Sequence, residues 1–379
     1  MPITTAVEAP WPRSEPSTLT PGVEQTQLRE AIRGLLTKWS GIEQVRAAAE
    51  TAVGYSPDLW RRLVEDMSIT ALAVPEDRGG LGYGMVEFGI ILEECGRNLV
   101  CEPVYTSAVV GMSALLAATA DDISDLLGNV LEGTMIATAT SLTPATDDVQ
   151  ASEAGDAWTL TGMATHVLGG AGADVVILSA NTASGRRLFV TTAGDHLVPS
   201  EREVIDPTRR QADLTLRQAP ALALTTAADH DQVCTQLLDL ATLALACENT
   251  GIVDALLEMT VQYVQTRHQF GRPIGSFQAI KHRLADVLVE LERARSACRY
   301  AAAVYDEDPA TARLAIAVAG SVCTDAALYA AAETVQLHGG VGFTWEHPAH
   351  SYFRRAMGNE ALQGDSRVHR ARIASLIGI

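Results

Sequence analysis

The chain has 379 residues and carries 28 lysines and arginines against 46 aspartates and glutamates, which gives a formal net charge of −18. Such an acidic surface repels a long polyanion and excludes nucleic acid as the expected partner, whereas a small anionic ligand needs only a local group of donors. Hydrophobic residues make up 47% of the chain and aromatic residues 5%, a composition typical of helix-rich globular proteins with a large core.

The cysteines and the N-terminus indicate a reduced, cytoplasmic protein. The six cysteines are scattered, with no C-x-x-C pair and no metal-binding spacing, and a chain this long does not need disulfides. The N-terminus lacks the basic start and apolar run of a secretory signal, and no apolar stretch reaches about 18 residues. We therefore expect no membrane segment, no metal site and buried thiols at Cys95, Cys101, Cys234, Cys247, Cys298 and Cys323.

The first 132 residues divide into an arm and a helical domain. Residues 1–20 are rich in Pro, Thr and Glu without an apolar period, which predicts a loosely held arm. From 21 to 132, apolar residues recur three and four apart, most clearly in 28–39 and 85–100. Four glycines within 75–84 predict a turn between these helices.

Residues 133–228 have a different texture. Five short runs rich in Thr, Val and Ile alternate with Gly, Asp, Asn and Pro, which predicts a small antiparallel β domain. From 229 to 379 the helical period returns and persists. The expected fold class is α+β, mostly α, with helical domains on either side of a central β domain.

Three stretches carry more specific patterns. Residues 267–286 (RHQFGRPIGSFQAIKHRLAD) place an arginine shortly before a glycine between two helical patterns. Arginine offers planar paired donors that suit a phosphate, although a cation there would also suit a helix C-terminus. Residues 336–356 (QLHGGVGFTWEHPAHSYFRRA) contain a glycine pair that lets the backbone approach another group closely, or simply turn. Residues 68–99 join a glycine-rich turn to a helix.

Together the three stretches resemble the acyl-CoA dehydrogenase superfamily over essentially the whole chain, and in particular divergent actinobacterial subunits of heteromeric steroid or fatty-acid acyl-CoA dehydrogenases. The resemblance implies a C-terminal domain of four-helix-bundle type, FAD as cofactor and α,β-dehydrogenation of an acyl-CoA thioester. It also implies a dimer or tetramer of like or unlike subunits, with an electron-transferring flavoprotein as electron acceptor.

The resemblance also assigns residues by position. In the family, the arginine of the first stretch reaches the FAD pyrophosphate of a neighbouring subunit, and the glutamine and phenylalanine beside it lie near the adenosine half. The second stretch passes so close to FAD that only glycine fits, whereas His338 is more often a structural neighbour than a base. The predicted FAD contacts are therefore Arg267, Gln269, Phe270, Gln336, Gly339 and Gly340.

The chain departs from the family at the catalytic base. The reaction needs a carboxylate to remove the α-proton while a hydride leaves to the flavin, on opposite faces of the substrate. In most members this base is a glutamate about nine residues beyond an Arg-Asp-Ala element. Here the element reads RRA at 354–356, and counting forward reaches Gln363, whose amide cannot accept a proton near neutral pH.

The residue at the second family location for the base is not a carboxylate either. Comparison back from Arg267 places Ala241 there and Thr242 beside it, where an arginine is usual. The nearest substitutes are Asp365, Glu360 and Glu248. Asp365 is the preferred candidate by proximity, and the competing interpretation is that it caps a helix.

The β domain also departs from the family. Residues 141–148 (SLTPATDD) stand where the family has a T-E-P-x-x-G-S-D-like loop, and 166–170 (HVLGG) stand where it has a Trp-Ile-Thr strand facing the flavin. Three hypotheses remain open. The chain is a dehydrogenase that uses Asp365 or another base, a base-lacking subunit that holds FAD in a heteromer, or a flavin-free scaffold.

Overall fold

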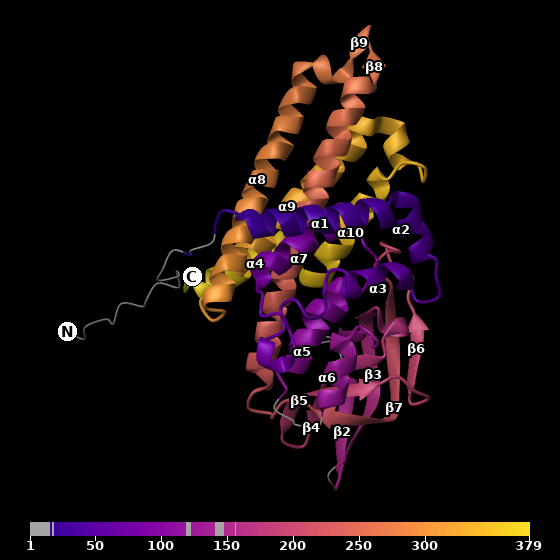
Figure 1. Ribbon diagram of the computed structural model, residues 1–379, viewed down its shortest axis with the longest axis vertical. Helices are drawn as coiled ribbons and strands as arrows, with labels where there is room; N and C mark the ends of the chain where they lie inside the picture. The colour runs from indigo at the N-terminus through magenta and orange to yellow at the C-terminus, as the bar shows by residue number, and fades with distance from the viewer. Residues whose placement is uncertain (1–15, 17–18, 119–122, 141–147, 156) are drawn as a thin grey trace, which may run out of the picture.

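The computed structural model describes residues 16, 19–118, 123–140, 148–155 and 157–379. The β domain lies at one end of the molecule, and the paired tips of two long helices form the other (Figure 1). Helical parts precede and follow the sheet in the chain, which confirms the expected fold class. Most of the predicted N-terminal arm lies outside the described residues.

The N-terminal part is helical and docks on the C-terminal helices. Its α4 starts at Met85, where the Asp306 carboxylate accepts hydrogen bonds from the Met85 and Val86 N–H groups at 2.7 and 2.8 Å. An aspartate of one domain thus caps a helix of another. The elements are α1 (Val23–Trp39), α2 (Ile42–Ala49), α3 (Pro57–Glu65), η1 (Glu76–Arg78), α4 (Met85–Arg97), the π-helix η2 (Val104–Gly111), α5 (Met112–Leu116) and α6 (Ser124–Leu131).

The β domain contains seven strands in one sheet that closes on itself. The pairings β4–β2–β3–β7–β5 return to β4, with β1 beside β4 and β6 beside β7. The expectation of a wholly antiparallel sheet is corrected at two places, because β1 runs parallel to β4 and β2 meets β4 in parallel at Gln150 and Asn181. The strands are β1 (Ala137–Ala139), β2 (Asp148–Ala154), β3 (Ala157–Leu168), β4 (Val175–Thr182), β5 (Gly185–Thr192), β6 (Leu197–Glu201) and β7 (Gln211–Ala223).

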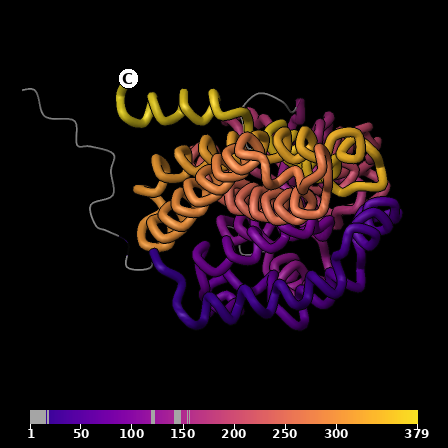
Figure 2. Tube along the Cα trace, turned by 90° about the horizontal axis from the view of Figure 1, so that it is seen from above, coloured from indigo at the N-terminus to yellow at the C-terminus, as the bar shows by residue number. Residues whose placement is uncertain are grey.

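The C-terminal part is built on three long helices packed through small side chains. Buried alanines such as Ala294, Ala301 and Ala330 let the helices approach closely. Figure 2 shows the N-terminal helices on one side of this layer and α11 on the other. The elements are α7 (His230–Thr266), β8 (His268–Gln269), β9 (Arg272–Pro273), η5 (Ile274–Ser276), α8 (Gln278–Glu307), α9 (Arg313–His338), η6 (Gly339–Phe343), α10 (Ala349–Gln363) and α11 (Ser366–Leu376).

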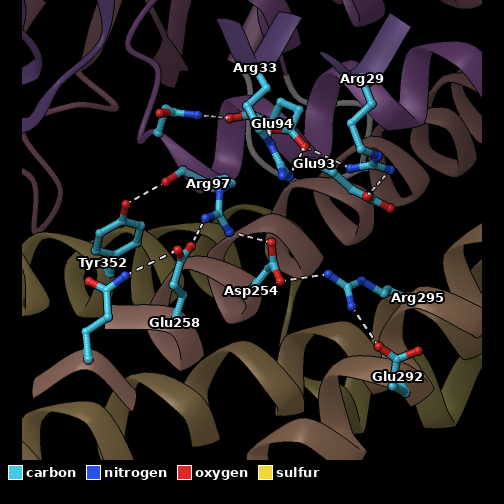
Figure 3. A network of polar contacts seen from close by, with 12 residues as sticks. Arg29, Arg33, Glu93, Glu94, Arg97, Asp254, Glu258, Glu292, Arg295 and Tyr352 are labelled. Carbon is cyan, nitrogen blue, oxygen red and sulfur yellow. Dashed lines mark hydrogen bonds and ion pairs between the residues drawn. The ribbon is translucent and has the colours of Figure 1, made fainter. Parts of the chain in front are cut away.

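Ion pairs tie the N-terminal helices to this layer (Figure 3). Arg29 of α1 binds Glu93 of α4 at 2.6 Å, and Arg97 of α4 pairs with Asp254 of α7. The Asp254 carboxylate also accepts from Arg295 of α8 at 2.7 Å. Of these pairs, the one between Arg97 and Asp254 joins the N-terminal helices to the C-terminal layer, and the other two brace its ends within each part.

Two described helices are long and apolar enough to cross a membrane by length and composition, although neither contains an uninterrupted apolar run of about 18 residues. They span His230–Thr266 and Arg313–Phe343, and 89% and 72% of their most apolar windows are buried inside the protein. Both are core helices of the C-terminal layer, and burial among other helices accounts for their apolar composition.

Candidate cofactor and acid-base site

The predicted FAD residues of the first stretch lie at the tip of the long helices. α7 ends at Thr266, and the Arg267 N–H closes the last turn by donating to the Tyr263 carbonyl at 2.9 Å. A two-residue hairpin of β8 and β9 follows, with Phe270 and Gly271 both at positive φ, as a type I′ turn requires. Arg267, Gln269 and Phe270 are exposed there, and Phe270 is 89% exposed.

The residues of the second stretch lie at the end of α9. Gln336 is exposed on the last turn, and Gly339 ends the helix at φ 60°. A side chain added at Gly339 or Gly340 would meet no atom of this chain within 4 Å. Gly340 has no positive φ either, so the fold itself does not explain this glycine. The open space at Gly340, which would admit a group from outside the chain, accounts for the glycine.

The two predicted segments touch each other. Tyr263 stacks on His338 with ring centroids 4.2 Å apart, and its hydroxyl donates to the His338 carbonyl at 3.4 Å. His338 Nδ1 donates to the Thr334 carbonyl at 2.8 Å, and burial lowers the pKa of the imidazole. His338 therefore packs the end of α7 against α9, in line with a structural role.

These residues fit a dinucleotide cofactor. The Arg267 guanidinium is exposed and forms no ion pair within the described part of the chain, so it is free to bind a phosphate. The open space at Gly339 and Gly340 leaves room for another group to approach the backbone there. The tip projects from the body of the chain (Figure 1). A bound FAD would therefore lie between this tip and another surface, and it would supply the redox chemistry there.

Gln363, which the resemblance places at the position of the family base, is half-buried and forms an amide contact. Gln363 is the last residue of α10, and its Nε2 donates to the Tyr105 hydroxyl at 2.9 Å. The Thr242 hydroxyl lies 3.3 Å from Gln363 Oε1, with its donor shared with the Leu238 carbonyl. The fold thus brings Gln363 close to Thr242, the neighbour of Ala241 in the chain, and none of these three residues offers a carboxylate.

Glu248 is held as an anion. Its carboxylate pairs with Arg355 at 3.0 Å and with Arg209, and it accepts from the Asn359 amide at 3.2 Å. Burial alone would raise the pKa of Glu248, but the two guanidinium groups outweigh it and hold the pKa at about 2. A carboxylate this acidic is a poor general base near neutral pH.

Asp365 is the N-cap of α11. Its carboxylate accepts from the N–H groups of Arg367 and Val368, both at 3.0 Å, and pairs with the Arg367 guanidinium at 2.7 Å. Hydrogen bonds from the Val368 N–H and the Arg367 side chain lower the pKa of Asp365. The geometry is that of a helix cap, the competing interpretation of this residue, and it gives no support to a base.

Sequence reasoning missed the partners of Gln363. One side of α10 carries a polar stripe at a spacing of four residues, formed by Arg355, Asn359 and Gln363. This stripe could have been found from the spacing alone. Tyr105 sits in an apolar run and gives no such signal. The Arg209 guanidinium lies over its ring, 5.3 Å from the centroid.

The hollows around the site differ in size. A cavity of about 50 Å³, lined partly by Glu102, Tyr105 and Arg209, has room for about one or two waters. A groove of about 730 Å³ runs between α4, η2, α7 and α8, and a hollow of about 650 Å³ adjoins it at Leu240 and Tyr305. We call these two the α4–α7 groove.

Two segments of the β domain, 141–148 and 166–170, were predicted to depart from the family pattern. Residues 141–147 lie outside the described residues. In the 166–170 segment, His166 has φ 56° and its N–H donates to Asp213 at 3.0 Å, while the Leu168 carbonyl accepts from Thr138 at 2.7 Å. The backbone groups of this segment are therefore partly used within the sheet.

Family profiles and relatives cover both helical parts. The acyl-CoA dehydrogenase C-terminal domain profile matches residues 232–377, and the N-terminal domain profile matches residues 22–125. Acyl-CoA dehydrogenase IpdE2 of Mycobacterium tuberculosis is 35% identical over 345 residues, covering 91% of this chain and 94% of that protein.

Two solved assemblies have a similar structure. A variant of the Tcur3481–Tcur3483 steroid ACAD is 30% identical, with a TM-score of 0.83 over 95% of this chain and 99% of the other. The ChsE4–ChsE5 complex from Mycobacterium tuberculosis is 29% identical, with a TM-score of 0.86 and the same coverage.

Proposed function

Because the chain belongs to the acyl-CoA dehydrogenase family, we propose that it holds FAD within an acyl-CoA dehydrogenase whose catalytic base comes from a second, unlike chain. Members of this family are FAD-dependent flavoproteins. The bound flavin supplies the hydride acceptor for oxidation of the CH–CH bond. This chain supplies the surfaces that bind and orient it.

The observation that carries the proposal is the amide of Gln363. The resemblance assigns it the place of the family glutamate, its side chain is half-buried and donates to the Tyr105 hydroxyl, and it cannot take the α-proton. Two of the three nearest carboxylates are committed, Glu248 to two arginines and Asp365 to the start of α11. A chain with this arrangement needs its base from elsewhere.

The cofactor half of the site supports a retained role in FAD binding. Arg267, Gln269 and Phe270 stand exposed on the tip, and Gln336, Gly339 and Gly340 border open space. We assign Arg267 to the pyrophosphate and the hairpin residues to the adenosine half of FAD shared with a neighbouring subunit. Two similar assemblies carry pairs of subunit names, Tcur3481–Tcur3483 and ChsE4–ChsE5, which favours an unlike partner.

The remaining assignments follow from the same proposal. We propose a CoA thioester as substrate, with a steroid-derived acyl group favoured by the similarity to a steroid ACAD. An electron-transferring flavoprotein is the proposed electron acceptor, and the cytoplasm is the proposed location. A self-sufficient dehydrogenase that uses Asp365 is the second candidate, and the capping geometry of Asp365 counts against it.

The test is to purify the full chain alone, record its flavin absorbance and add a panel of acyl-CoA thioesters without oxygen. We expect no bleaching of the flavin by the chain alone. Bleaching should follow when a paired chain with a glutamate at the base position is supplied. Full bleaching by this chain alone would overturn the proposal and restore a self-sufficient enzyme.

A further inference from the structure

Three thiols meet in the core of the C-terminal layer. Cys247 of α7, Cys298 of α8 and Cys323 of α9 are each at most 2% exposed. The Sγ atoms of Cys298 and Cys323 lie 3.3 Å apart, and the Thr250 hydroxyl lies 3.4 Å from the first sulfur and 3.7 Å from the second. A sulfur–sulfur bond is about 2.05 Å long, so a shift of about 1 Å would join this pair.

A small cavity of about 30 Å³ reaches the cluster from the side of α1 and α4, with room for about one or two waters. Cys247 and Cys298 line it, and Cys323 lies behind Cys298 without lining it. Gly89 of α4 forms part of the wall, and a Cβ added there would come within 3.1 Å of the Cys247 sulfur. The exposed Leu19 also lines the cavity, which therefore borders the surface.

The surroundings of Cys298 favour it as the nucleophile of the three. Cys298 accepts hydrogen bonds from Cys247 and Cys323, and these bonds lower the pKa of Cys298 although burial opposes them. The same bonds raise the pKa of the two donors. The positive charge of the adjacent Arg299, which also lines the cavity, lowers the pKa of Cys298 further. Because the thiolate is the reactive form of cysteine, Cys298 is the thiol prepared to react.

The cluster has no part in the chemistry described so far. Within the described ranges, no group of three His, Cys, Asp or Glu side chains is arranged to hold a metal ion. A close thiol pair of which one member meets a cavity is instead suited to oxidation, because the first sulfur can react with a small oxidant and the second can then displace the product.

We propose that Cys298 and Cys323 are a dithiol that hydrogen peroxide oxidises to a disulfide between α8 and α9, with the small cavity as the route of entry. The Cys298 thiolate attacks one peroxide oxygen, the O–O bond breaks, and the departing hydroxide takes up a proton to become water. The Cys323 sulfur then attacks the resulting sulfenic acid, and its hydroxyl group leaves with the Cys323 proton as a second water. Two thiols thus lose two electrons to one peroxide. No residue assigned to FAD or to the thioester takes part, so the inference is independent of the proposed function.

The experiment treats the full chain, as purified, with one equivalent of hydrogen peroxide and then blocks the remaining thiols with N-ethylmaleimide in denaturant. We expect the thiol count to fall from six to four per chain. Cleavage after arginine leaves Cys298, Cys323 and Cys247 on the separate peptides 296–299, 314–354 and 218–267. Mass spectrometry should find the first two peptides joined, and dithiothreitol should restore six thiols.

Three results with the wild type would overturn the inference. One is that all six thiols stay free. Another is that oxidation is confined to Cys101, which is half-buried and would react first if exposure alone decided. The third is a disulfide between Cys247 and Cys298, which would remove Cys323 from the pair.

Serine variants separate the roles of the cysteines. Cys323→Ser should stop at the sulfenic acid, which dimedone traps as one adduct on Cys298. Cys298→Ser should keep all its remaining thiols under the same treatment. Cys247→Ser is the matched control, because it alters the same cavity but leaves the pair, and it should still form the disulfide. Where a serine variant does not fold, the alanine variant replaces it, and the wild-type result decides without either.

A bulky reagent tests the route of entry. An aromatic disulfide reagent is far larger than the cavity and should leave Cys298 of the native protein unmodified, whereas peroxide oxidises it. Reaction of Cys298 with this reagent as fast as with peroxide would reject the cavity as the route.

Discussion

The guanidinium of Arg355 lies 3.0 Å from the carboxylate of Glu248, and neither side chain is more than 3% exposed. Arg355 also binds Asp206 of the β domain at 2.7 Å and the carbonyls of Leu99 and Val100 at 3.3 and 3.1 Å. One side chain of α10 thus joins α7, the β domain and the N-terminal helices. The placement of Gln363 two turns further along α10 depends on it.

Replacing Arg355 by methionine should lower the free energy of unfolding by about 3–5 kcal/mol, because Asp206 would remain buried without a cation and Glu248 would keep only Arg209. The midpoint of urea unfolding measures this. Arg61→Met is the matched control, since Arg61 pairs with the exposed carboxylates of Asp58 and Glu65 on α3 and its loss should change stability far less. Equal shifts for both variants would contradict the network.

Asp365 should behave as a helix cap. Asp365→Ala should lower the temperature of unfolding, because two N–H groups of α11 lose their acceptor, whereas Asp365→Asn should lower it much less. Thermal unfolding distinguishes the two variants. Dye reduction by the complete assembly should be unchanged in both. Loss of turnover in Asp365→Asn with FAD still bound would identify Asp365 as the base after all.

Arg267→Ala should release FAD, because a pyrophosphate would lose its paired guanidinium donors. Arg267→Lys should retain only part of the cofactor, since an ammonium group cannot form two parallel hydrogen bonds. Bound flavin per chain, read from the visible absorbance after gel filtration, is the measurement. Arg61→Ala serves as a surface control. A yellow, fully loaded Arg267→Ala protein would reject the assignment.

Glu102 should make stability depend on pH. Burial raises its pKa to about 7, so its folded-state pKa exceeds the ordinary value of 4.5. Its contribution is fully present below about pH 4.5 and is lost as pH rises through 7. Glu102→Gln should therefore gain stability relative to the wild type across this window, reaching about 3 kcal/mol at pH 8.

Glu248→Gln is the control, because its effect on stability should depend on pH in the opposite direction. The pKa of Glu248 is lowered to about 2, so its stabilising effect is present above about pH 4.5 and lost as pH falls towards 2. Thermal unfolding of both variants between pH 3.5 and 8 checks the pair. A constant difference from the wild type for Glu102→Gln would show that its carboxyl titrates alike in both states.

The strands illustrate what the sequence could predict. Runs rich in Val, Ile and Thr identified β1, β3, β4, β5 and β7. β2 (DVQASEA) and β6 (LVPSE) were missed, because their residues lack that signature. β2 forms through its long antiparallel register with β3, and β6 through its register with β7, which are tertiary effects that no local pattern shows.

The candidate site also has features that the sequence predicts and features that only the structure shows. The ends of α7 and α9 were located in advance because glycines and an arginine stand at fixed spacings there, and the loss of a carboxylate at Gln363 can be read from the chain. The contact between Gln363 and Tyr105 spans 258 positions and lies in an otherwise apolar helix. Only the packing of α10 against η2 reveals it.

The closed circuit of strands also bears on how the protein behaves at high concentration. A free strand edge offers unpaired N–H and C=O groups to other molecules and can template intermolecular sheets. Among the described strands, the ring β4–β2–β3–β7–β5 closes between β2 and β4 through one residue pair, and further edges lie at β1, which has three residues, and at β6, which carries Pro199 and ends at Glu201. A very short edge, and an edge interrupted by a proline and a charge, resist strand addition, so β1 and β6 are poor templates for intermolecular sheets.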